Sequence, residues 1–160
     1  MKSKRAADLV VNEWLRLPET IEKSIAGLTD DHLDRRAGKD GMSPRETVHH
    51  LVEANIVACS MMIAALGASG SVYDWSWLYP NTRWVERMGY SKIPVEPALA
   101  ALKGLCRQFA NLINARPDAL RCEVRVFDSP GAETYTLTVA AILQQELDHA
   151  AEHLGELEMR

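Results

Sequence analysis

Apolar residues recur at steps of three and four positions through four separate stretches of the chain. This spacing places apolar side chains along one face of a helix, so it constrains the fold strongly. The first stretch carries Ala6, Val10, Trp14, Leu17, Ile21, Ile25 and Leu28. Pro18 lies inside this stretch, and because proline removes a backbone donor, we expect a kink or break near Leu17.

The second and third helices have recognisable ends. The second is expected to begin at Ser43, since a serine cap, Pro44 at the first helical position and Glu46 in a capping box favour a helix start. Its apolar stripe comprises Val48, Leu51, Val52, Cys59, Met62 and Ile63, and residues 67–71 end it. The third helix is expected from about Glu96 to Ala115, followed by Pro117.

The last quarter of the chain predicts a short hairpin and then the fourth helix. Residues 120–126 alternate apolar and charged side chains, and residues 128–131 are typical of a turn. The fourth helix is expected from about Leu137 to the C-terminus. Four amphipathic helices bury their stripes economically against one another. We therefore predict an all-α, up-down four-helix bundle that forms a single domain over residues 1–160.

Charge and composition exclude several classes of partner. The formal net charge is −4, so the chain lacks the positive field that nucleic-acid binders use. No stretch approaches the roughly 18 uninterrupted apolar residues of a membrane span, and the N-terminus is amphipathic, which is unlike a signal sequence. We expect a cytoplasmic protein. Cys59, Cys106 and Cys122 are odd in number and widely spaced, which predicts reduced thiols.

The segment between Tyr73 and Tyr90 is rich in tryptophan and tyrosine and shows no period. We interpret it as an irregular connection that covers another part of the protein. Arg83 and Arg87 are candidates to bind a substrate carboxylate. Trp84 is a candidate for the wall of a substrate pocket, and a subunit interface is an equal interpretation.

Two histidines lie four residues apart in the fourth helix. His149 and His153 would be separated by about 40° of rotation and about 6 Å of rise, so they would project side by side and could chelate one ion. An isolated pair with this spacing is also a common accident. A solvated helix edge, or a pair of hydrogen-bonded core histidines, explains the pair equally well.

The second helix offers one further histidine to the same site. His49 and His50 differ by about 100° around the helix, so only one of them can point toward a given site. His49 falls in the sector of Glu53 and is expected to be solvated. His50 falls beside Ala54 and is expected to be half-buried. A half-buried imidazole needs a hydrogen bond or a ligand role, so His50 is the better third ligand. His32 is interpreted as a surface residue.

Two segments resemble the DinB/YfiT-like family of four-helix bundles, which have a three-histidine metal site. The first, LTDDHLDRRAGKDGMSPRETVHHLVEAN, is similar to the family's acidic loop, serine-initiated second helix and His-Leu pair, and matches one ligand to His50. The second, LTVAAILQQELDHAAEHLGELE, is similar to the family's last helix and places two ligands at His149 and His153. The order and separation of these segments agree as well, so the resemblance spans essentially the whole chain.

The chain departs from the family at Met42, where many members have tryptophan, and this bears on packing more than on ligation.

Three neutral imidazoles leave coordination positions open for water or substrate. Imidazole suits zinc, nickel and iron alike, so the ligand type does not select the divalent metal. Glu146 and Glu156 lie one turn from a histidine and could orient a ring or act as a base, although exposed helix acids are the simpler interpretation.

Two classes of function stay open at this point. The resemblance implies a metal-dependent enzyme that acts on a small molecule, with transfer or isomerisation using a low-molecular-weight thiol in characterised members; hydrolysis would suit the same site. The alternative is a non-catalytic metal-binding or stress-associated bundle that forms a homodimer through its apolar helix faces. A pocket beside the ion lined by tryptophan or arginine would favour the enzyme, whereas a fourth protein ligand that sealed the metal would favour the other class.

Overall fold

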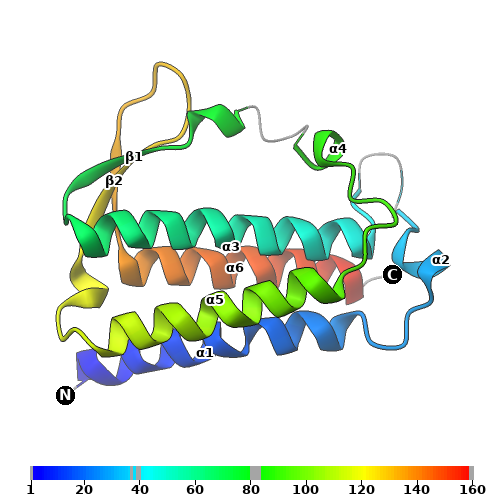
Figure 1. Ribbon diagram of the computed structural model, residues 1–160, viewed down its shortest axis with the longest axis horizontal. Helices are drawn as coiled ribbons and strands as arrows, with labels where there is room; N and C mark the ends of the chain where they lie inside the picture. Colours follow the sequence, from blue (N-terminus) through cyan, green and yellow to red (C-terminus); the bar gives the residue numbers. More distant parts are fainter. Residues whose placement is uncertain (1, 37, 39–40, 80–83, 159–160) are drawn as a thin grey trace.

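A computed structural model describes residues 2–36, 38, 41–79 and 84–158 of the chain. Its body is formed by the long helices α1 (Lys2–Ser24), α3 (Pro44–Gly67), α5 (Glu96–Asn114) and α6 (Val139–Glu158) (Figure 1). Helices α1 and α3 each pack mainly against α5 and α6, so they occupy opposite corners of a four-helix bundle. The expected bundle is confirmed, and the start and end of each helix fall close to the predicted positions.

The direction of the helices differs from a simple up-down order. Beyond the end of α5, Arg116 donates a hydrogen bond to the carbonyl of Leu66 near the end of α3. At the opposite end, Arg45 in the first turn of α3 donates to the carbonyl of Ile93, just before α5, at 3.0 Å. Helices α3 and α5 therefore run in the same direction (Figure 1). The predicted alternation is wrong because the long segment between α3 and α5 returns the chain to the end at which α3 began.

A small sheet at one end of the bundle makes the protein mainly α, not all-α. Strands β2 (Glu123–Phe127) and β3 (Tyr135–Thr138) pair antiparallel, which confirms the predicted hairpin. Strand β1 (Ser71–Asp74) pairs with β2 in parallel and was not predicted. Its partner lies about fifty residues further along the chain, so the local sequence carried no signal of the pairing. The short helices are α2 (Asp30–Leu33), η1 (Ser76–Leu78), α4 (Trp84–Met88) and η3 (Ala119–Arg121).

Helix α3 begins as the sequence predicts. The Ser43 hydroxyl accepts a hydrogen bond from the Glu46 amide, and the Glu46 carboxylate accepts one from the Ser43 amide at 2.8 Å, which completes the capping box. By length and mean hydropathy this helix could cross a membrane, but half of its apolar window is buried inside the bundle, as in a core helix. Ile63, which was placed on the apolar stripe, is exposed because it lies about 100° around the helix from the fully buried Met62.

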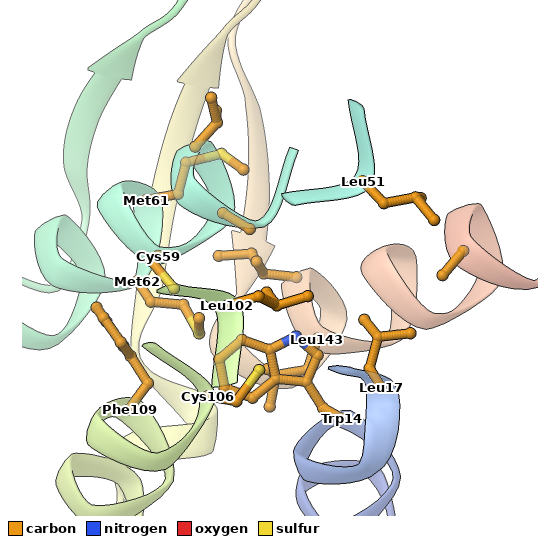
Figure 2. Close-up of a cluster of buried hydrophobic side chains, with 14 of the residues drawn as sticks. Trp14, Leu17, Leu51, Cys59, Met61, Met62, Leu102, Cys106, Phe109 and Leu143 are labelled. Carbon is orange, nitrogen blue, oxygen red and sulfur yellow. The ribbon is translucent and has the colours of Figure 1, made fainter. Parts of the chain in front are cut away.

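The core forms where the four long helices meet (Figure 2). Helix α1 continues through Pro18, so of the expected kink or break the break is wrong, and the kink stays a prediction. Leu17 and Ile21 are buried on either side of the proline, and their packing holds the helix in place. The three cysteines are free, as predicted, and all three are buried. Burial raises the pKa of the Cys59 and Cys106 thiols to about 12, so both remain protonated at neutral pH.

Candidate metal centre

Three histidines from two neighbouring helices meet at one point. Helix α3 provides His50, and α6 provides His149 and His153, one turn apart. The Nε2 atom of His149 lies 3.2 Å from Nε2 of His50 and 3.0 Å from Nε2 of His153. One ring nitrogen from each histidine lies within 4.8 Å of the other two. The packing of α3 against α6 thus brings together the three residues that the sequence singled out.

The spacing of these nitrogens fits a divalent cation. A tetrahedral ion that binds imidazole nitrogens at about 2.0–2.1 Å holds any two of them about 3.3 Å apart. The observed separations from His149 to His50 and His153 are close to this value. Without a cation, the single Nε2 lone pair of His149 would face the ring nitrogens of both His50 and His153. At least one of these two contacts would then lack a well-formed hydrogen bond. A cation accepts all three lone pairs at once.

The electrostatic setting keeps the His50 and His149 rings neutral. Burial, assisted by the neighbouring His149 and His153, lowers the pKa of His50 to about 4. Burial also lowers the pKa of His149. Neutral imidazole is the form that binds metal, so these rings need not lose a proton at pH 7 before coordination. On the far side of the centre, Nδ1 of His153 lies 3.5 Å from a carboxylate oxygen of Glu156, which favours the ring orientation that directs Nε2 inward.

His49 is buried and lies outside the centre. Its ring stacks on that of Tyr90 with 4.9 Å between centroids, and its Nε2 lies 3.3 Å from the carbonyl oxygen of Ile93. The expectation of a solvated His49 is wrong because the connection between α3 and α5 folds over this part of α3. The choice of His50 as the converging histidine is confirmed. His32 is exposed, as expected.

A pocket of about 290 Å³ opens beside the histidines, with mostly apolar walls. It is lined by His50, Glu53, Ala54, Val57, Met61, Trp75, Leu78, Trp84, Tyr135, Leu137, Gln145, Glu146 and His149. The tryptophan-rich connection supplies one wall, so its interpretation as a cover is confirmed. Trp84 lines the pocket, whereas Arg87 is exposed and absent from the described lining; a substrate-binding role for Trp84 stays a prediction. Arg83 lies outside the described residues.

Glu53 belongs to this pocket and was missed as a site residue. It lies one turn after His50, and its carboxylate accepts a hydrogen bond from Nε1 of Trp84. Burial and this carboxylate raise the pKa of Tyr90 well above its usual value. The signal available in the sequence was the spacing of three residues from His50, which places both side chains on adjoining surface.

Glu146 lines the pocket, so its interpretation as an exposed helix acid is wrong. One of its carboxylate oxygens is buried and has no hydrogen-bond partner among the described residues. Burial raises the pKa of Glu146 to about 7. The exposed interpretation fails because Tyr135 and Leu137 of the hairpin share the pocket with this face of α6. A carboxyl group with a pKa near neutrality is suited to accept and return a proton.

Comparison with known proteins agrees with this geometry. The family model of the DinB superfamily matches residues 13–157. A protein of Geobacillus thermodenitrificans named "Putative metal-dependent hydrolase" is 29% identical over 121 residues, which cover 72% of this chain and 64% of the relative. A relative of the same description from Oceanobacillus iheyensis is 23% identical over 110 residues, covering 66% of this chain and 62% of its own. The chain thus spans slightly less than two thirds of the length of these relatives.

A solved structure shares the fold. YfiT from Bacillus subtilis is described in its title as "a probable metal-dependent hydrolase with an unusual four-helix bundle topology". It superposes with a TM-score of 0.80 over 96% of this chain and 86% of its own, at 18% sequence identity. At this identity the likeness establishes the common fold.

Proposed function

This chain belongs to the DinB superfamily, and we propose that it is a metal-dependent hydrolase whose divalent ion is held by His50, His149 and His153. The observation that carries the proposal is the convergence of three imidazoles at the edge of a pocket large enough for a small organic molecule. The names of the relatives, which refer to metal-dependent hydrolysis, support the same reaction class.

A divalent ion at this centre would polarise a substrate carbonyl and lower the pKa of water at an open coordination position. The residues of the chain supply the remaining functions. Glu146, buried in the same pocket as His50 and His149, takes the proton that water loses on attack and returns it to the leaving group. The apolar walls limit access of bulk water to the reacting bond.

The open pocket favours an enzyme over a non-catalytic metal-binding or stress-associated bundle. In the described part of the chain the histidine group includes no fourth cysteine, histidine or carboxylate ligand, and tryptophans line the adjoining pocket. Transfer or isomerisation with a low-molecular-weight thiol would use the same open position, with the thiolate in place of water. We favour hydrolysis because of the names of the relatives. Zinc, nickel and iron suit the ligands equally. That the protein is a cytoplasmic homodimer stays a prediction.

The proposed reaction is tested with metal-loaded and chelator-treated protein on a panel of small esters and amides, with and without added thiol. We expect metal-dependent release of acid in the absence of thiol. Product that forms only when a thiol is present, and that contains the thiol, would replace hydrolysis by the transferase reading. Equal rates with loaded and metal-free protein across the panel would favour the non-catalytic bundle.

Replacing Glu146 by glutamine should lower kcat by about 10²–10⁴-fold, because the amide cannot accept the proton from water. Metal content should stay at the wild-type level, since Glu146 is outside the ligand group. The matched control is Glu152→Gln, which removes an exposed acid from the same helix and should leave kcat within about twofold. Equal activity of Glu146→Gln and Glu152→Gln would remove Glu146 from the mechanism.

The two adjacent histidines of α3 should behave differently when each is replaced by alanine. His50→Ala should lose the ion because one of three ligands is gone. His49→Ala should retain it, because the His49 ring interacts with Tyr90 and the Ile93 carbonyl instead. Elemental analysis of both purified variants after reconstitution with zinc checks this prediction. Retention by His50→Ala together with loss by His49→Ala would overturn the assignment.

A further inference from the structure

The part of the pocket formed by the connection and the hairpin combines aromatic rings with a carboxylate. Trp75 follows β1, Trp84 begins α4, and Tyr135 begins β3, so three separate elements bring aromatic side chains to one space. Glu53 of α3 lines the same space. We call Trp75, Trp84, Tyr135 and Glu53 the aromatic end of the pocket. Aromatic faces attract organic cations, and a carboxylate adds a full negative charge.

Glu53 is held in place at this end. Its carboxylate accepts a hydrogen bond from Nε1 of Trp84, and the Tyr90 ring stacks on His49 of the same helix. The hydrogen bond holds the Trp84 side chain beside the carboxylate. The carboxylate and the rings are therefore arranged before any ligand arrives, which reduces the entropy lost on binding.

The charges that line the pocket are acidic. The ionisable side chains of its described lining are Glu53, Glu146, Tyr135, His50 and His149, with no lysine or arginine among them. Glu146 lies one turn from His149, beside the proposed ion. Among the described lining residues, no lysine or arginine offsets the Glu53 carboxylate. A substrate anion placed at the aromatic end would face this carboxylate in a partly desolvated setting, which is unfavourable.

We propose that the substrate of this pocket is an organic cation, an alkylammonium compound whose charged group lies between Glu53 and the aromatic rings. The inference rests on the proposed function, because the labile bond of this substrate would then lie at the histidine end. It reverses the expectation that Arg83 and Arg87 bind a substrate carboxylate. Specificity for the cation comes from residues that are separate from the three metal ligands.

The test compares choline with 3,3-dimethylbutan-1-ol, which has the same shape and hydroxyl group but no charge. Binding of each to zinc-loaded, full-length protein is followed by tryptophan fluorescence and calorimetry. Choline should bind about tenfold more tightly than the alcohol. The comparison uses the wild-type protein alone, so it does not depend on the folding of any variant. Equal affinities would overturn the proposal.

Glu53→Gln should remove the preference, lowering choline affinity about tenfold and leaving that of the alcohol unchanged, because the amide oxygen still accepts from Trp84. Glu123→Gln, which removes an exposed acid from β2, should leave both affinities unchanged. A choline preference that persists in Glu53→Gln would also contradict the proposal. Zinc content measured on the same samples separates the organic-cation proposal from the proposed metal site. If the protein binds zinc but does not prefer choline, only the organic-cation proposal is wrong. If the protein prefers choline but does not bind zinc, only the proposed metal site is wrong.

Discussion

Replacing His149 by alanine is expected to reduce metal affinity by more than about 100-fold and to leave the purified protein essentially free of metal. His149 is the middle of the three histidines, because its Nε2 contacts the ring nitrogens of both His50 and His153. Loss of groups that only orient a ligand costs about 10–100-fold in affinity, and loss of the ligand itself should cost more. Competition with a zinc-sensitive dye, together with elemental analysis, measures the effect.

The matched control for this substitution is His32→Ala. His32 is exposed and its ring forms a hydrogen bond with the Thr29 hydroxyl, so the variant should bind one ion per chain, as we expect of the wild type. Zinc should also raise the melting temperature of the wild type and of His32→Ala, because an ion that binds only the folded state stabilises it. The His149→Ala variant should show no such increase. The same zinc affinity in His149→Ala and His32→Ala would refute the site.

Replacing Trp14 by alanine should lower the free energy of unfolding by about 3–5 kcal/mol. The Trp14 side chain is fully buried among residues of the other long helices (Figure 2). Its Nε1 donates a hydrogen bond of 2.7 Å to the Asn55 side chain, which is also fully buried. The substitution therefore leaves both a cavity and an unpaired buried amide oxygen. Urea unfolding followed by circular dichroism measures the loss.

Two further variants separate these contributions. Trp14→Phe keeps most of the ring volume but removes the donor, so it should cost about 1–3 kcal/mol for the unpaired Asn55 oxygen, plus a smaller packing loss. Trp77→Ala removes an exposed tryptophan whose ring contacts that of Trp84, so it should cost no more than about 0.5–1.5 kcal/mol. Similar unfolding free energies for Trp14→Ala and Trp77→Ala would show that α1 does not anchor the core as described.

The long helices could be predicted because residues close together in the sequence determine where each helix begins and which face it buries. The capping box at Ser43 and the apolar stripe of α5 are set by residues within a few turns of one another. The convergence of His149 and His153 likewise follows from helical spacing. Their meeting with His50 depends on the packing of α3 against α6, and the family resemblance supplied that pairing before the structure did.

The remaining features depend on contacts between distant segments. Strand β1 exists because Ser71 pairs opposite Val124. The helical patterns alone predict solvated His49 and Glu146 side chains, but His49 is buried and Glu146 is half-buried because the connection and the hairpin cover those faces. Helices α3 and α5 run in the same direction because of the long connection between them. No periodic pattern in the sequence predicts the path of that connection. Spacing along one helix therefore predicts neighbours on that helix but not the segment that will cover it.

The most direct measurement is anomalous X-ray diffraction from crystals of the zinc-loaded protein, with data collected on both sides of the zinc absorption edge. The account predicts one strong peak per chain, about 2.0–2.1 Å from an imidazole nitrogen of each of His50, His149 and His153. A fully loaded crystal with its peak elsewhere, or with these three rings bonded only to one another, would contradict it.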